Sequence, residues 1–124
     1  ICKIWELSYD RLTDYTTEGR LIGHLVMGLE LVERHAAQIP GFPDRKKMLI
    51  KHVLLSHHGE LEYGSPRRPK TLEAILVHQA DYLDSKFNSA HAFIQNDKTM
   101  GEWTALHREA GRYFLKTPFE LNSP

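Results

Sequence analysis

The sequence predicts an all-α fold, a helical bundle in one domain. Three long stretches carry apolar residues at three- and four-residue steps, the spacing of one face of a helix. Proline and glycine separate these stretches, and we find no strand-rich region, internal repeat or low-complexity tract. The chain has 124 residues, 41% of them hydrophobic, which suffices for one domain with a buried core.

The first helix is expected from about Tyr15 to Ile39 and ends at Pro40-Gly41. His24 lies one turn from Leu21 and Gly28, so we expect it at the edge of the core-facing stripe. A histidine there can be a hydrogen-bonded core residue or a metal ligand, and its position alone leaves both open. The apolar positions of this helix are Leu21, Leu25, Leu29, Val32, Ala36 and Ile39.

The second helix is expected to begin at Pro43-Asp44 and to end near His58-Gly59. Neighbouring side chains on a continuing helix point about 100° apart, which would send His57 and His58 to different surroundings. Glycine is the usual residue just past a helix C-terminus. A helix that ends at the pair lets both imidazoles face one cleft.

The segment 60–70 is expected to be a loop, because one glycine and two prolines interrupt both the helix and the strand pattern. It carries Arg67, Arg68 and Lys70, close in sequence to the histidine pair. Guanidinium groups can hold a phosphate with paired hydrogen bonds. A solvated basic loop is an equally reasonable interpretation.

A third, long helix is expected from Thr71 to about Asn96, with a nearly heptad apolar stripe. Asp81 and Asp84 lie in a polar seam beside that stripe, where a carboxylate can be a ligand or simply solvated. A short helix is possible over 103–114. The stripe consists of Leu72, Leu76, Ala80, Leu83, Phe87, Ala90 and Ile94.

The composition narrows the function. Sixteen basic and sixteen acidic residues cancel, so the overall charge gives no bulk attraction to nucleic acid or to an anionic membrane. The one cysteine, Cys2, excludes an internal disulfide framework. No stretch is apolar enough to cross a membrane and no signal peptide is recognisable, so a cytoplasmic location is expected. Eight histidines are many for this length, and histidine is the commonest metal ligand.

Each long helix supplies a group that can bind a metal: His24, the His57–His58 pair, and Asp81. Helical bundles build metal sites from such inward-facing side chains. Imidazole and carboxylate together suit Mn²⁺, Fe²⁺ or Zn²⁺ better than a calcium cage, and the thiolates of a structural zinc site are missing. The chain has no CxxC pair, HExxH helix or glycine-rich phosphate loop.

Three stretches, "YTTEGRLIGH", "LLSHHGELEYGSPRRPKTLEA" and "QADYLDSK", resemble successive motifs of the HD superfamily of metal-dependent phosphohydrolases. The resemblance covers about residues 1–93 and is strongest to the HD domain of the YhaM-type 3'→5' exoribonucleases. It implies an HD-domain-like helical bundle, a single domain over 1–124 that lacks its first helices, with a less distinctive extension over 97–124. The opening "ICKIWEL" is similar to the residues after the family's His-Asp dyad, so that dyad is expected just before Ile1.

The resemblance also implies roles for individual residues. His24, His57 and His58 correspond to metal ligands, Asp81 to the closing aspartate, and Asp84 to an acidic position that orients a ligand. Lys3 corresponds to the lysine that lies close to substrate phosphate, and Cys2 stands where the family has glycine.

The chemistry implied is phosphodiester hydrolysis with two divalent ions that activate water, Mn²⁺ or Fe²⁺ being favoured and Mg²⁺, Zn²⁺ or Ni²⁺ possible. The substrate would be single-stranded RNA, with the loop cations Arg67, Arg68 and Lys70 on its phosphates. Two alternatives stay open: a nucleotide or cyclic-dinucleotide phosphohydrolase, and a helical module without catalytic activity, because the dyad is absent from this chain.

Overall fold

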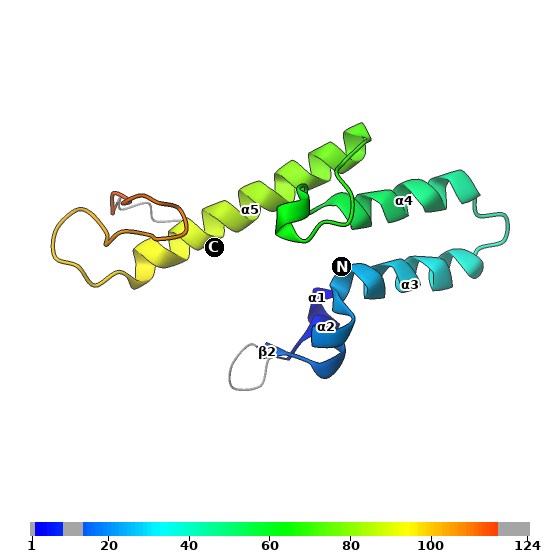
Figure 1. The fold of residues 1–124 in the computed structure, drawn as a ribbon, viewed down its shortest axis with the longest axis horizontal. Coiled ribbons are helices and arrows are strands. Elements are labelled where there is room, and N and C mark those ends of the chain that lie inside the picture. Colours follow the sequence, from blue (N-terminus) through cyan, green and yellow to red (C-terminus); the bar gives the residue numbers. More distant parts are fainter. Residues whose placement is uncertain (1, 9–13, 117–124) are drawn as a thin grey trace, which may run out of the picture. The chain divides into compact units, whose positions relative to one another are not determined.

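The computed structural model describes residues 2–8 and 14–116, which divide into two compact units, 1–81 and 82–124. Ile1 of the family motif and residues 117–124 of the expected extension lie outside the described residues. The first unit contains every element up to the first turns of α5, and α5 continues into the second unit (Figure 1). In chain order the elements are α1 (Lys3–Glu6), β1 (Leu7–Ser8), β2 (Asp14–Tyr15), α2 (Thr17–Leu21), α3 (Gly23–Ala37), α4 (Asp44–Ser56), the 3-10 turn η1 (Leu61–Tyr63) and α5 (Leu72–Asn96).

The described elements are mostly helical, which confirms the predicted all-α class. In the first unit α3 and α4 lie side by side and run in opposite directions, joined by a short turn at Pro40-Gly41 (Figure 1). The two short strands form an antiparallel pair, Leu7 with Tyr15 and Ser8 with Asp14. No described helix is both long enough and apolar enough to traverse a bilayer.

The single helix expected from Tyr15 to Ile39 is wrong at its start. Tyr15 belongs to β2, and the helical region divides at Ile22 into α2 and α3. Gly23 opens α3 with a φ of 77°, a left-handed conformation that glycine adopts readily. Apolar spacing does not register such a residue, so the break was invisible to the pattern. The break turns the chain, and His24 lies in the first turn of α3, which packs against α1.

Close packing holds α2 against α1. The Thr16 hydroxyl caps α2 by accepting from the Gly19 amide at 2.9 Å, and it donates to the carbonyl of Trp5 at 2.9 Å. A side chain at Gly19 would overlap the main-chain carbonyl of Glu6. The absence of a side chain there therefore allows α2 to approach the end of α1 directly.

The second helix ends where the sequence predicts. α4 stops at Ser56, His57 and His58 follow in a turn, and Gly59 has a φ of 84°. The predicted loop over 60–70 is present and includes η1. Ser65 is buried, and its hydroxyl lies 2.9 Å from the carbonyl oxygen of Leu55 in α4 and 2.6 Å from that of Arg67. The basic loop is thereby tied to the last turn of α4.

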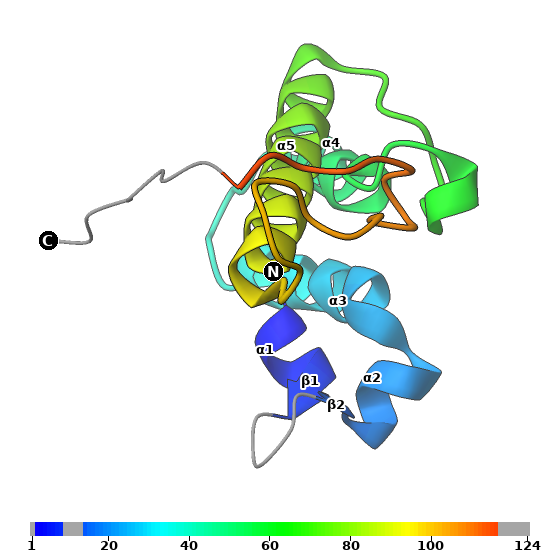
Figure 2. The same cartoon turned by 90° about the vertical axis from the view of Figure 1, so that its left-hand side faces the viewer.

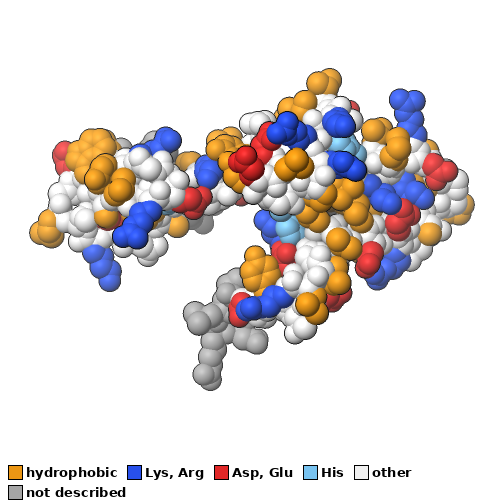
Figure 3. Space-filling model, in the orientation of Figure 1, with side chains coloured by type: hydrophobic (Ala, Val, Ile, Leu, Met, Phe, Trp, Pro, Cys, Tyr) orange, Lys and Arg blue, Asp and Glu red, His pale blue; other side chains and the backbone are white. Residues whose placement is uncertain are grey.

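The third helix is also confirmed, since α5 spans Leu72–Asn96. Its buried residue is Ala74, fully enclosed, and not the expected apolar stripe. Leu72 is 83% exposed and Leu76 is 70% exposed, and hydrophobic side chains are correspondingly spread over the surface in Figure 3. Heptad spacing predicted the helix correctly, but it did not predict which residues of the helix are buried among the described residues.

The short helix expected over 103–114 is wrong. The chain there folds back as a narrow ribbon, with bridges from Trp103 to Leu115 and from His107 to Arg112 (Figure 2). Asp97 holds the base of this ribbon: its carboxylate accepts from the Ala105 amide at 2.8 Å and pairs with Lys116 at 2.7 Å. The hydrogen bond from Lys116, helped by those from Thr99 and Ala105, holds the pKa of Asp97 well below its usual range.

Cys2 is buried and has a φ of 64°, the left-handed region that disfavours side chains. Glycine adopts this backbone conformation without that cost. Cys2→Gly and Cys2→Ala both remove the thiol, so their difference isolates the backbone. We expect Cys2→Gly to be the more stable by about 1 kcal/mol in urea unfolding, although glycine is ordinarily the less stable residue of the two.

Gly28 is the matched control, because it lies inside α3 and an added Cβ would make ordinary contact with Leu54. There the order should reverse, with Gly28→Ala gaining about 0.5–1 kcal/mol over the unmodified chain. If the Cys2→Ala variant were as stable as the Cys2→Gly variant, or more stable, backbone strain at Cys2 would be ruled out.

Candidate metal centre

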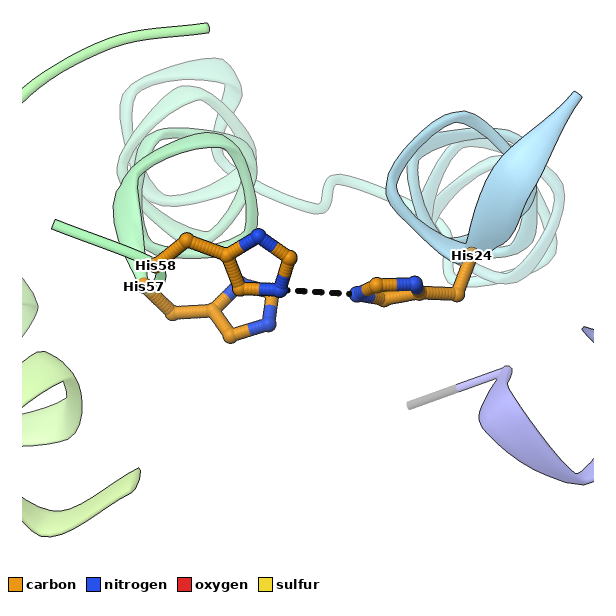
Figure 4. Close-up of side chains that lie close together, drawn as sticks. All are labelled: His24, His57 and His58. Carbon is orange, nitrogen blue, oxygen red and sulfur yellow. Dashed lines mark hydrogen bonds between the residues drawn. The ribbon is translucent and has the colours of Figure 1, made fainter. Parts of the chain in front are cut away.

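Three histidines from two helix ends meet in the first unit (Figure 4). His24 lies in the first turn of α3, and His57 and His58 follow α4. One ring nitrogen of each lies within 4.8 Å of the others, and Nε2 of His24 is 3.1 Å from Nε2 of His58. The rings of His57 and His58 are 4.4 Å apart at their centroids, so the adjacent pair faces one place.

Glu6 holds the ring of His24 from the other side. Its Oε1 accepts from Nδ1 of His24 at 2.9 Å and from the main-chain amide of His24 at 3.1 Å. Both side chains are close to buried, with 11% of His24 and 10% of Glu6 exposed. Because Nδ1 donates to the carboxylate, Nε2 is the unprotonated nitrogen of the ring. Its lone pair faces the histidine pair and is available to a cation.

Burial favours the neutral form of Glu6, but two hydrogen bonds from His24, its charge and that of Lys3 outweigh this effect. The net result is a pKa of Glu6 below its ordinary value. The carboxylate therefore stays ionised at neutral pH. A charged acceptor strengthens its hydrogen bond to the ring and makes the imidazole a more basic donor to a cation.

His57 is oriented by the helix that precedes it. Its Nδ1 donates to the carbonyl of Leu54 at 2.7 Å, which satisfies one of the last carbonyls of α4 and leaves Nε2 as the ring's acceptor atom. Its own carbonyl accepts a hydrogen bond of 2.9 Å from Nδ1 of His78, on α5. Hydrogen bonds thus fix both the ring and the main chain of His57.

Both histidines of the pair resist protonation. Burial is the main cause of the lowered pKa of His57 and of His58, and the neighbouring imidazoles act in the same direction. The charge of Asp81 opposes the shift at both residues, and Lys3 adds to it at His58. Neutral imidazoles at pH 7 have the lone pairs that metal binding requires.

The other predicted residues of the first unit lie around this group. Asp81 is exposed and does not belong to the cluster of three histidines, although its charge acts on both His57 and His58. Lys3 is exposed, and its charge acts on His58 and Glu6. Two charges of opposite sign, on Asp81 and Lys3, therefore act on the histidine cluster in addition to that of Glu6.

The predicted phosphate-binding cations differ in what they contact. Arg68 is paired with Glu60 at 2.8 Å, so its charge is already balanced. Lys70 donates its main-chain amide to Nε2 of His52 at 2.9 Å, and its side chain is exposed, as is that of Arg67. Asp84 lies in the second unit, where its carboxylate accepts from Asn88 at 3.0 Å.

The cluster fits a divalent cation by its own geometry. Two nitrogens that bind one ion at about 2.1 Å are separated by about 3.0–3.4 Å, and the Nε2 atoms of His24 and His58 have this separation. Three half-buried imidazoles would repel one another if protonated. A divalent ion bound by His24, His57 and His58 would satisfy all three lone pairs at once.

Two contributors were missed by reasoning from the sequence. Glu6 belongs to the opening stretch "ICKIWEL", and nothing in its spacing from His24 indicates contact. His78 lies on α5 and was assigned no role from the sequence. The signal that could have found it is its spacing of three residues from Asp81, which puts both on one helix face.

The chain belongs to the HD domain family, whose model matches residues 4–86. Membership of this family implies binding of a divalent metal ion, and the histidine cluster at the ends of α3 and α4 agrees with that.

Among named relatives, the 3'-5' exoribonuclease YhaM of Listeria welshimeri is 41% identical over 96 residues, 77% of this chain and 30% of that protein. The protein of the same name from Bacillus pumilus is 40% identical over 119 residues, 94% of this chain and 37% of the relative. That from Oceanobacillus iheyensis is 37% identical over 123 residues. The chain spans about a third of the length of these relatives, and no solved structure gives a significant match.

The pKa shifts of the histidine pair predict how acid affects stability. In the unfolded chain both rings titrate near 6.5, and in the folded protein their pKa is lower. Below 6.5 the unfolded state therefore binds more protons, so stability is complete above this pH and decreases as the pH falls.

We expect the free energy of unfolding of the metal-free protein, measured with urea in a chelating buffer, to decrease from about pH 7 to about pH 5. The double variant His57→Gln/His58→Gln should show a shallower decrease over the same range. Stability that rises on acidification in the unmodified protein would contradict the assigned direction.

Proposed function

We propose that this chain is the HD domain of a metal-dependent phosphohydrolase that degrades single-stranded RNA from its 3' end. The observation that supports it most is the cluster of His24, His57 and His58, with two of the three rings fixed so that Nε2 is open to a cation. The names of the relatives support the RNA substrate. The proposal covers the substrate and activity of the whole protein, of which this chain is the metal-binding domain.

In this proposal His24, His57 and His58 hold a divalent ion, and Asp81 contributes its carboxylate to the same site or to a second ion. Mn²⁺ or Fe²⁺ are the favoured ions, with Mg²⁺, Zn²⁺ or Ni²⁺ as alternatives, because the ligands combine imidazole with carboxylate. Such ions lower the pKa of water and stabilise the charge that develops on a phosphate. Glu6 keeps the ring of His24 in one tautomer throughout.

Cationic side chains of the first unit would bind the substrate. The charge of Lys3 acts on His58. We propose that Lys3 contacts a phosphate held at the cluster. Among the loop cations, Arg67 and Lys70 have no carboxylate partner within the described ranges, whereas Arg68 is paired with Glu60. We therefore propose that Arg67 and Lys70 hold the non-bridging or upstream phosphate oxygens, with Arg68 ordering the loop.

Metal binding is the first test. The unmodified chain should bind Mn²⁺ stoichiometrically in calorimetric titration, and His57→Ala or His58→Ala should weaken binding at least about 100-fold, because each removes a ligand. His35→Ala is the matched control, since His35 is exposed and lies on the same helix as His24. If the unmodified, folded chain bound no divalent ion, the proposed metal centre would be refuted.

Substrate profiling is the second test, made on the metal-loaded chain and on the full-length protein. Release of nucleoside monophosphates from an oligoribonucleotide, lost in Asp81→Ala and in His57→Ala, supports the exoribonuclease. Hydrolysis of a cyclic dinucleotide or a free nucleotide in its place supports the alternative phosphohydrolase. Metal binding without hydrolysis of any of these substrates by either protein favours the non-catalytic module.

Glu6→Gln keeps the size of the side chain and an oxygen acceptor but removes the charge. Because the weaker acceptor makes the His24 ring a poorer donor, we expect the affinity for Mn²⁺ to fall about 10-fold while the protein stays folded. Glu18→Gln, a substitution on the exposed part of α2, should leave the affinity unchanged. Equal affinities for Glu6→Gln and the unmodified chain would separate Glu6 from the metal centre.

A further inference from the structure

We infer that His78 is a positioning residue of the metal centre: it fixes the main chain of the histidine pair and, with it, the turn of α5 that carries Asp81. This inference rests on the proposed function, because it concerns how ligands of that site are held. His78 itself is not assigned as a ligand, since its Nδ1 is bonded to a main-chain carbonyl.

The first observation is the hydrogen bond at the end of α4. Nδ1 of His78 donates to the carbonyl oxygen of His57 at 2.9 Å. The carbonyls beyond the last turn of a helix have no partner inside the helix, and a side chain from elsewhere that satisfies one of them holds the chain where it leaves the helix. The position of that carbonyl sets the direction in which the next residue, His58, departs.

The second observation is the contact with Gly59. Gly59 is buried, and a side chain built on it would overlap the imidazole of His78. Its φ of 84° is independently unfavourable for any residue with a side chain. The ring of His78 therefore occupies space that only a glycine leaves open, directly after the two clustered histidines.

The third observation links this contact to Asp81. His78 and Asp81 are three residues apart on α5, so their side chains share one helix face. The charge of Asp81 acts on both His57 and His58. Anchoring His78 to the main chain of the pair thus also fixes the turn from which Asp81 acts on them.

The test compares two substitutions of His78, one that keeps a hydrogen-bond donor and one that removes it. His78→Asn retains an N–H donor near the position of Nδ1, whereas His78→Leu retains bulk and removes the donor. On the folded metal-free chain, we expect His78→Leu to weaken Mn²⁺ binding about 10- to 100-fold and His78→Asn to recover most of that loss. The visible spectrum of the Co²⁺-loaded protein, which reports ligand geometry, should change in His78→Leu and be close to native in His78→Asn.

His91→Leu is the control, because it makes the same substitution on the same helix in the second unit. A merely structural role would lower the melting temperature of His78→Leu and leave both Mn²⁺ affinity and the Co²⁺ spectrum as in the unmodified chain, which would overturn the inference. If the unmodified chain bound no metal, the proposed function would fail and this inference with it. Loss of binding in His78→Leu alone, with His91→Leu unaffected, supports it.

A double-mutant cycle tests the contact without metal. Gly59→Ala should cost less stability in a His78→Ala background than in the unmodified chain, because the overlap with the ring is gone while the strain of the positive φ is the same in both. Additive losses in the two backgrounds would show that His78 and Gly59 are not in contact, and would overturn the inference.

Discussion

The arrangement of the first unit depends on one buried interaction, the carboxylate of Glu6 with the imidazole and amide of His24. It joins the short α1 to the second residue of α3, and both groups are nearly excluded from water. A carboxylate in such a place is costly unless its oxygens are satisfied, and here a ring N–H and a main-chain N–H satisfy the same atom. Three residues make this contact possible. Gly19 allows α2 to approach α1 closely, the Thr16 hydroxyl caps α2, and Gly23 turns the chain at the start of α3.

The histidine pair is held by hydrogen bonds to carbonyl groups at the end of the other helix, α4. α4 delivers the pair at its C-terminal end, where the carbonyls of Leu54 and His57 need partners. One is satisfied by the ring of His57 and the other by His78. The same unpaired carbonyls that would be a liability at a buried helix end therefore become the means by which two rings are aimed.

Two of the long helices and the placement of the histidine pair could be predicted from the sequence. Periodicity and the positions of proline and glycine predicted α4 and α5 to within a few residues, and the glycine after the pair indicated that both rings leave a helix end together. Spacing could not show the break at Gly23, because a left-handed glycine leaves the apolar pattern intact. It also could not show Glu6 against His24, since that contact joins residues 18 apart across a turn and a strand pair. The ribbon over 103–115 was missed because its aromatic residues are compatible with either a helix or a strand.

The distance along the chain between the ligands has a consequence for folding. His24 and His58 are 34 residues apart, and their ring nitrogens meet only when α3 and α4 are packed together. If the proposed ion is bound by both, it would close that loop as a crosslink does, and the unfolded chain would give it no such site. Loading the centre therefore draws the folding equilibrium toward the native state, by about 2.7 kcal/mol at a free ion concentration one hundred times the dissociation constant. In a cell, the supply of such an ion would then govern how much of this domain is folded.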